Sequence, residues 1–319
     1  MSYTEHFLQL FAKQSEVFPS IMGQKRAKDQ IKSALLMNRH MLILGPPGIG
    51  KTTLVKNIVD ILPSSEKADR FVRVQGSPDL TVEDLIGDID PIKALKFGPT
   101  SREAFQPGKI FQANEGVLFF DEVNRCSEKL QNALLQALEE GIATIGSYDI
   151  DLPTQFIFIG TLNPNDSSTE KLSDAFLDRF DIVEMNYPET LLIEKDIVLK
   201  SAQKLSVEYD EKLVDYTIAF VRRLRNPKKL VRFPSVRATI GLFERAQANA
   251  VIKGRDHVTL ADISDAVKSV ISHRIELKPS LKYAQSAEEF VDEQFLKYAK
   301  EEQLPPEDIE NIEKNGDST

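Results

Sequence analysis

The stretch Gly45-Pro46-Pro47-Gly48-Ile49-Gly50-Lys51-Thr52 decides the fold of this chain. It fits the pattern G-x-x-x-x-G-K-[ST], in which backbone N–H groups of a glycine-rich loop surround phosphate oxygens. The apolar run Met41–Leu44 predicts a strand before the loop, and Lys51–Ile61 predicts a helix after it. That context is the one the pattern requires, and the helix N-terminus adds its dipole. We therefore expect the loop to bind the phosphates of ATP.

Single positions of the loop have distinct expected roles. Gly48 and Gly50 let the backbone turn its N–H groups inward around the phosphates. Lys51 places a cation on the outer phosphates, and the Thr52 hydroxyl is a ligand for Mg²⁺. We assign nucleotide binding to all eight residues of the loop and to Thr53 after it. The alternative is a Gly/Pro turn that matches the pattern by chance.

The remaining strands of the first half follow from short runs rich in β-branched and aromatic residues. Helical patterns separate several of these runs, which is typical of a mostly parallel sheet with helices on both faces. The five predicted strands are Met41–Leu44, Arg70–Val74, Val117–Phe120, Phe156–Gly160 and Ile182–Met185.

Strand patterns stop after Pro188, and helical periodicity takes over. The sequence thus predicts an α/β domain over 1–188, an all-helical domain over 189–280, and an acidic tail over 281–319. The tail is expected to hold one amphipathic helix and a disordered end. The helices expected in the second domain cover roughly 190–204, 211–225, 235–253 and 260–273.

Composition bounds the class of protein. An apolar share of 41% and a charged share of 28% are typical of a soluble globular protein. The single cysteine, Cys126, excludes an internal disulfide, no apolar run is long enough to span a bilayer, and Met1–Leu10 lacks a signal-peptide pattern. We expect a cytoplasmic location without membrane insertion. The net charge is −9, mostly from the tail, and makes nucleic acid an unlikely main ligand.

A second motif, Val117-Leu118-Phe119-Phe120-Asp121-Glu122, is an apolar strand that ends in two carboxylates. Asp121 is expected to hold the water shell of Mg²⁺, and Glu122 to polarise the attacking water. The alternative is a buried strand that runs into a polar turn. The upstream phosphate loop favours the catalytic interpretation.

Three further polar residues are candidates for contacts with the nucleotide. Asn163, just past the strand Phe156–Gly160, could reach the attacking water or the γ-phosphate, although Asn-Pro also starts turns. Arg179 and Arg237 could each neutralise charge on the γ-phosphate, or could be ordinary surface arginines.

Together these residues resemble the AAA+ ATPase superfamily, and within it the branch that holds the MoxR ATPases and the I subunit of magnesium chelatase. The resemblance runs from about Phe18 to Arg274. The segment Ser127–Gly141 is similar to a MoxR helix, whereas Gly87–Leu95 and His273-Arg274 are closer to the chelatase subunit. The resemblance implies a three-layer αβα domain with a five-stranded parallel sheet, followed by a helical lid.

The resemblance also implies roles for single residues. Asn163 matches sensor one, Arg237 matches sensor two on the lid, and Arg179 matches the arginine finger that reaches a neighbour's nucleotide. Arg125 is a second candidate for the contact between subunits, and Gln24 lies in a box near the adenine. ATP and Mg²⁺ are the implied cofactors, and a homo-oligomeric ring of six subunits is the implied assembly.

Two segments are longer than ordinary connections. One covers about 80–111, and the other, about 142–153 with Gly146-Ser147 at its centre, alternates like a β-hairpin. The resemblance implies that such inserts face the central pore or the substrate. The alternative is a pair of surface loops.

Four functional hypotheses remain open from the sequence. The leading one is a MoxR-type ATPase that remodels or activates client proteins, or inserts metal cofactors into them, with a von Willebrand factor A domain partner. The second is a chelatase-like motor for metal insertion into a tetrapyrrole, and a third is a nucleotide switch that barely hydrolyses ATP. A fourth, a DNA-binding helicase-like ring, is favoured only by a run of cations that consists of Arg222, Arg223, Arg225, Lys228, Lys229 and Arg232.

Overall fold

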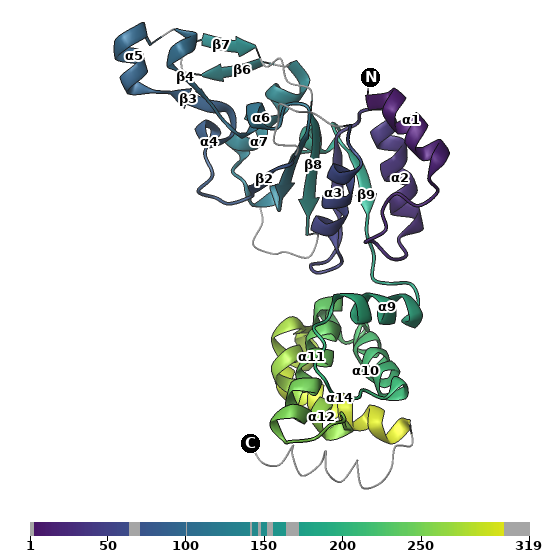
Figure 1. Cartoon of the computed structure of the whole chain (residues 1–319). Coiled ribbons are helices and arrows are strands. Elements are labelled where there is room, and N and C mark those ends of the chain that lie inside the picture. The colour runs from purple at the N-terminus through teal and green to yellow at the C-terminus, as the bar shows by residue number, and fades with distance from the viewer. Residues whose placement is uncertain are drawn as a thin grey trace. The chain divides into compact units, whose positions relative to one another are not determined.

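The computed structural model of the chain describes residues 3–63, 71–99, 101–140, 142–145, 148–151, 156–163 and 172–302. The chain forms two compact units (Figure 1). Residues 1–46 and 50–186 make up the first unit, and residues 47–49 and 187–319 make up the second. Within the described ranges, no helix combines the length and the apolar character needed to cross a bilayer.

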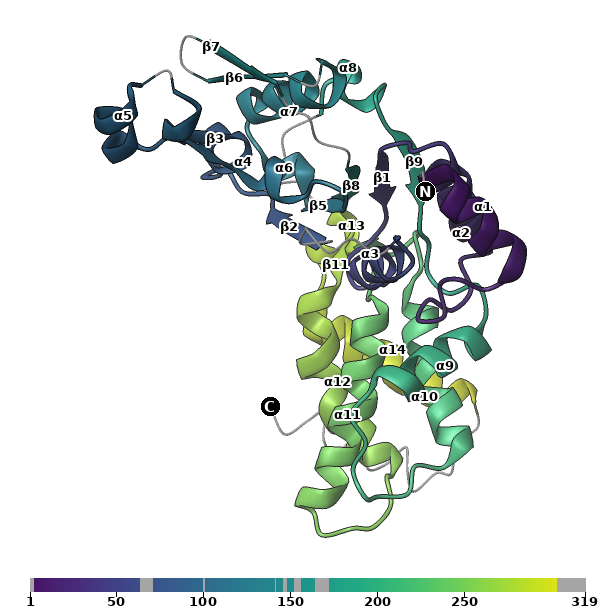
Figure 2. The same cartoon turned by 45° about the horizontal axis from the view of Figure 1, so that its top comes forward.

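A five-stranded parallel sheet forms the centre of the first unit, in the order β2-β5-β8-β1-β9 (Figure 2). The middle strands are buried on both faces, as continuous apolar runs predict for parallel strands. The expected sheet is confirmed, and each strand lies within two residues of its prediction. The strands are β1 (Met41–Leu44), β2 (Phe71–Gln75), β5 (Val117–Asp121), β8 (Ile157–Leu162) and β9 (Asp181–Glu184).

Helices pack around this sheet. On one face, α7 (Glu128–Glu140) places Leu130 and Leu134 in the same apolar core as Leu118 and Phe120 of β5. This contact follows from the i, i+4 spacing of the apolar residues of α7. Figure 2 shows α3 and α7 with the strands of the sheet. The other helices of the unit are α1 (Tyr3–Lys13), α2 (Lys25–Leu36), α3 (Lys51–Asp60), α4 (Val82–Ile86), α5 (Pro91–Phe97), α6 (Lys109–Gln112) and α8 (Asp174–Leu177).

Both long connections of the first unit contain paired strands. In the first connection, β3 (Gly87–Ile89) pairs antiparallel with β4 (Phe105–Pro107), and α5 lies between them in the chain. In the second, β6 (Ile142–Ile145) pairs antiparallel with β7 (Tyr148–Asp151). The turn at 146–147 and residues 152–155 lie outside the described residues.

The second unit is built mainly from helices around a large apolar core, in which Phe220, Leu242 and Ile263 are almost completely buried. A capping box of Thr259 and Asp262 begins the helix Leu260–Ile271. The helices are α9 (Leu191–Ser201), α10 (Glu211–Leu224), α11 (Val236–Ile252), α12 (Leu260–Ile271), α13 (Pro279–Lys282) and α14 (Ala287–Glu301).

Two expectations for this unit need correction. The unit is not entirely helical, because β10 (Leu230–Arg232) pairs with β11 (Glu276–Leu277). These strands are too short for their periodicity to be recognised in the sequence.

The helix expected in the acidic tail, α14, is also not separate from the helical unit. Phe290, Phe295 and Tyr298 are buried in the same core as Phe220. The sequence predicted an amphipathic helix here, but the negative charge of the segment concealed that the helix belongs to this core. The expected disordered end, residues 303–319, lies outside the described residues.

Candidate active site

The phosphate loop connects β1 to α3, as the sequence predicts. Gly48 (φ +75°) and Gly50 (φ +98°) adopt left-handed backbone conformations that favour glycine. Gly50 begins α3 without a capping hydrogen bond from its own side chain, since it has none. The first N–H groups of α3 are therefore suited to an anionic ligand.

Lys51 folds back over this loop. Its Nζ donates hydrogen bonds to the carbonyl oxygens of Gly45, at 2.6 Å, and Pro46, at 3.0 Å. These contacts keep the cation within the loop. Thr52 is half-buried in the first turn of α3, and Thr53 is exposed.

Asp121 lies at the carboxyl end of β5, and both of its carboxylate oxygens have partners. Thr161 of the neighbouring strand β8 donates its hydroxyl proton to Oδ1 at 2.6 Å. Arg73 of β2, on the other side of β5, makes an ion pair with Oδ2 at 2.6 Å.

Glu122 has a left-handed backbone conformation (φ +56°), which is unusual for a residue with a side chain. Its backbone N–H donates to Thr161 Oγ1 at 2.9 Å, so one buried hydroxyl links both acidic residues. Its carboxylate oxygen Oε2 accepts a hydrogen bond from Gln75 and pairs with Arg125, each at 3.1 Å. Backbone strain of this kind clusters at functional sites.

Gly76, directly after β2, packs against the backbone of the acidic pair. Its N–H donates to the carbonyl oxygen of Asp121 at 2.7 Å. A Cβ atom at Gly76 would lie 2.0 Å from the carbonyl oxygen of Glu122, so this position requires glycine.

Asn163 follows directly after β8. The carbonyl oxygen of the preceding residue, Leu162, accepts a hydrogen bond from the N–H of Gly45 at 3.3 Å. Asn163 therefore lies beside the start of the phosphate loop. Because β1, β8 and β5 are adjacent and parallel, the loop, Asn163 and the acidic pair all follow the same edge of the sheet.

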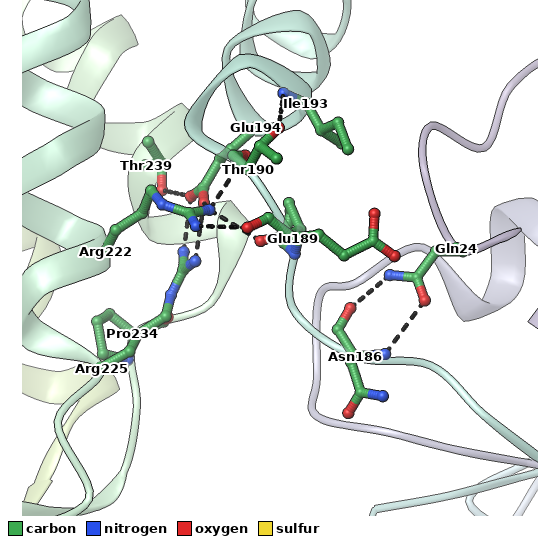
Figure 3. A network of polar contacts seen from close by, with 11 residues as sticks. Gln24, Asn186, Glu189, Thr190, Ile193, Glu194, Arg222, Arg225, Pro234 and Thr239 are labelled. Atoms are coloured by element: carbon green, nitrogen blue, oxygen red, sulfur yellow. Dashed lines mark hydrogen bonds and ion pairs between the residues drawn. The ribbon is translucent and has the colours of Figure 1, made fainter. Parts of the chain in front are cut away.

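Gln24 lies at this edge too, but its amide is engaged. It donates through Nε2 to the carbonyl oxygen of Asn186 at 2.5 Å and accepts from the Asn186 N–H at 3.2 Å (Figure 3). Asn186 lies just past the end of β9. The observed contacts of this amide are thus structural.

Arg179 lies at the opposite edge of the sheet, because it precedes the amino end of β9. Its guanidinium forms an ion pair with Glu139, near the end of α7, and its side chain is half-exposed. Arg125, the alternative finger, instead pairs with Glu122 at the carboxyl edge.

Arg237 belongs to the second unit, in the first turn of α11. Arg274 is near it. Burial and the positive charge of Arg237 both lower the pKa of the Arg274 guanidinium from its ordinary value. The second unit therefore carries two arginines close together.

The basic run that raised the possibility of DNA binding makes contacts within the second unit. Arg225 binds both oxygens of the buried Glu194, at 2.6 and 2.7 Å, and Thr239 donates to the same carboxylate at 2.7 Å (Figure 3). Arg222 adds a contact at 3.1 Å and also binds the carbonyl oxygen of Pro188. Burial raises the pKa of Glu194, but these hydrogen bonds outweigh it and hold that pKa below its ordinary value.

Three other cations of the run also have partners inside the unit, so most of its charge has a structural role. The pairs are Arg223 with Glu301, Lys229 with Gln294, and Arg232 with the carbonyl oxygens of His273 and Ile275.

The donor groups fit a nucleotide with Mg²⁺. The Thr52 hydroxyl and the Asp121 carboxylate are hard oxygen donors, which Mg²⁺ prefers, and such sites use one or two carboxylates together with phosphate oxygens. Among the described residues no cluster of three or more His, Cys, Asp or Glu side chains forms a separate metal site.

Sequence reasoning missed Arg73, Gln75, Gly76 and Thr161. Gln75, Gly76 and Thr161 lie at or just past the carboxyl ends of the strands that flank β5, whereas Arg73 lies in the middle of β2. Polar residues at the ends of apolar runs were a usable signal, but the sequence does not give the order of the strands.

Comparison with known families agrees with this geometry. The ATPase family associated with various cellular activities (AAA) matches residues 40–182, and the AAA lid domain matches residues 232–294. The uncharacterized protein YeaC of Bacillus subtilis is 30% identical to this chain, covering 89% of this chain and 92% of its own length.

Two other relatives have descriptive names. Chaperone MoxR1 of Mycobacterium tuberculosis is 27% identical and covers 82% of this chain and 74% of its own length. A magnesium-chelatase subunit ChlI homolog of Methanocaldococcus jannaschii is also 27% identical and covers 82% and 86%. A mutant of Thermotoga maritima RuvB shares the fold, with 21% identity, a TM-score of 0.52 and coverage of 78% of this chain and 70% of that chain.

A phosphate loop after β1, an acidic pair at the end of β5 and a helical lid define a P-loop ATPase. The chain belongs to the AAA+ ATPases, in the branch that includes MoxR and the I subunit of magnesium chelatase. Its activity is the hydrolysis of ATP.

Proposed function

We propose that this protein is a MoxR-type ATPase that couples Mg-ATP hydrolysis in a ring to the remodelling, activation or metal loading of client proteins. The observation that carries the proposal is the separation of the site residues between two edges of one sheet. The phosphate loop and Asp121-Glu122 follow the carboxyl edge, whereas Arg179 lies at the amino edge.

Within one subunit, we assign phosphate binding to the loop and Lys51. Thr52 and Asp121 would hold Mg²⁺, which would neutralise phosphate charge when bound. Glu122 accepts a proton from the attacking water, and Asn163 orients that water. Thr161 fixes the positions of Asp121 and Glu122 through its two hydrogen bonds.

Arg179 is assigned to the nucleotide of the neighbouring subunit. An arginine at the amino edge of its own sheet is poorly placed for a loop at the carboxyl edge, but a head-to-tail contact brings these edges of two subunits together. Closed head-to-tail contacts make a ring, and we propose six subunits. We also assign the role of sensor two to the lid arginine Arg237.

A protein client is supported by the insert between β3 and β4. Helix α5 has no buried residue, and its apolar side chains Ile92 and Leu95 are 79% and 91% exposed. Exposed apolar clusters of this kind are typical of protein–protein contact sites. We assign this surface to a client or to a partner with a von Willebrand factor A domain, in the cytoplasm.

The test is recovery of partners by the full chain with Glu122→Gln, which should bind ATP without hydrolysing it. We expect a client and a von Willebrand factor A domain protein to be retained with ATP and lost without it. Leu95→Ser should weaken this retention, while Leu192→Ser, at a site 69% exposed in the second unit, should not. Equal recovery with and without ATP would contradict the proposal.

A chelatase-like motor is the second candidate, because relatives include subunits of that name. In that case the same experiment would recover subunits that bind a tetrapyrrole, and tetrapyrrole would stimulate ATP hydrolysis by the mixture. We do not propose a DNA motor, because the basic run that suggested one is mostly bound within its own unit.

A further inference from the structure

The ion pair between Arg73 and Asp121 occupies the carboxylate that we assign to the metal. Arg73 Nη2 lies 2.6 Å from Asp121 Oδ2, and the hydroxyl of Thr161 binds the other oxygen, Oδ1. Both carboxylate oxygens are therefore engaged by groups of the chain itself. None of the steps assigned to hydrolysis uses Arg73.

The two partners of Asp121 differ in their freedom to move. Thr161 is completely buried in the central strand β8, whereas the Arg73 side chain is 48% exposed on the edge strand β2. Arg73 can withdraw into solvent without disturbing the sheet. The other observed contacts of its guanidinium are weak, since it lies 3.4 Å from Gln75 Oε1 and 5.8 Å from the centre of the Phe119 ring.

We propose that Arg73 is a gate residue that competes with Mg²⁺ for Asp121, so that Mg-ATP has to displace it before the site is ready for hydrolysis. A guanidinium and a divalent cation repel each other when they share one carboxylate, so the two states exclude one another. This inference rests on the proposed assignment of Asp121 to Mg²⁺. Its consequence is that Arg73 raises the Mg²⁺ concentration the site needs.

The test measures binding of a fluorescent ATP analogue to the full chain with Glu122→Gln, as a function of Mg²⁺ concentration. Adding Arg73→Gln should lower the Mg²⁺ midpoint about two- to fivefold, the range expected for loss of a partly exposed ion pair. Arg73→Lys keeps the positive charge, so its Mg²⁺ midpoint should stay closer to that of the parent protein. An unchanged or higher midpoint for Arg73→Gln overturns the gate.

Arg39→Gln is the matched control. Arg39 lies in the same unit, is 53% exposed and pairs with Asp181 at 2.8 Å, away from the acidic pair. Its removal should leave the Mg²⁺ midpoint unchanged. An equal shift in this variant would show that loss of any surface cation produces the effect, and would overturn the gate.

Asp121→Asn distinguishes failure of the gate from failure of the site assignment. This change should raise the Mg²⁺ midpoint, and adding Arg73→Gln to it should then have no effect. If Asp121→Asn leaves the midpoint unchanged, the metal assignment fails and the gate fails with it. If Asp121→Asn raises the midpoint but Arg73→Gln alone does not lower it, only the gate fails.

Discussion

At the scale of single residues, the acidic pair depends on one buried hydroxyl. Thr161 Oγ1 accepts from the N–H of Glu122 at 2.9 Å and donates to Asp121 at 2.6 Å. The Thr161 hydroxyl therefore both stabilises the strained backbone of Glu122 and orients the carboxylate of Asp121. Sequence reasoning identified both acids but not the residue that positions them, because that residue comes from a different strand.

Thr161→Val keeps the shape of this side chain and removes its hydroxyl. We expect turnover to fall at least tenfold, and the free energy of unfolding to fall by about 1–3 kcal/mol, because two polar groups lose their partner. Thr161→Ser keeps the hydroxyl and should therefore retain most of the turnover and most of the free energy of unfolding. Steady-state ATP hydrolysis and urea unfolding measure the two effects. Normal turnover in Thr161→Val would contradict the positioning role.

His40 provides a pH-dependent contribution to stability. Burial, and then the nearby charge of Arg39, lower the pKa of His40 to about 4, and its Nδ1 accepts a hydrogen bond from the Phe158 N–H at 3.1 Å. The unfolded chain binds a proton here at a higher pH than the folded chain does. This contribution is therefore present above about pH 6.5 and is lost as the pH falls from there toward 4.

Between pH 7.5 and 5.0, His40 should cost the folded state about 2 kcal/mol. Urea unfolding at both pH values should show this loss in the parent chain and a smaller one in His40→Gln. The comparison uses the change with pH, so a general destabilisation by the substitution does not affect it. An identical pH dependence in the two proteins would contradict the assignment.

At the scale of elements, the sequence predicts where each strand begins and ends better than it predicts which strands lie side by side. Apolar runs place β1, β5 and β8 within two residues, because burial on both faces leaves a continuous apolar pattern. The order of the strands depends on how the connecting helices cross the sheet, which local patterns do not encode. The contacts of Arg73 and Thr161 with Asp121 could not be predicted for that reason.

Helix α14 was predicted as a helix, but its place in the core of the second unit was not. The negative charge of the segment suggested a separate, solvent-exposed tail. Phe295 is 2% exposed in the core of the second unit. Phe295→Ala should lower the unfolding free energy of that unit by about 3–5 kcal/mol through loss of buried area and creation of a cavity. Tyr283→Ala, at a site 93% exposed, should have little effect. Thermal unfolding distinguishes them, and equal stability would contradict a core role for α14.

At the scale of the whole molecule, the proposed assignment of Arg179 leaves one subunit with an incomplete site. The loop and the acidic pair lie at one edge of the sheet, and the finger candidate Arg179 lies at the other. Hydrolysis should therefore depend on assembly and rise with protein concentration. The family resemblance suggested this role for Arg179, and the parallel pairing of β9 with β1 gives it a geometric reason.

The central claim is that Arg179 acts on the nucleotide of a neighbouring subunit, and mixing two inactive variants tests it most directly. Arg179→Ala should bind ATP normally but lose about 10³-fold in turnover, and Lys51→Ala should lose ATP binding. In an equal mixture, about a quarter of the interfaces join an intact loop to an intact Arg179, so hydrolysis should return well above that of either variant. If mixed rings form and hydrolysis stays at the level of the separate variants, Arg179 does not act across the interface.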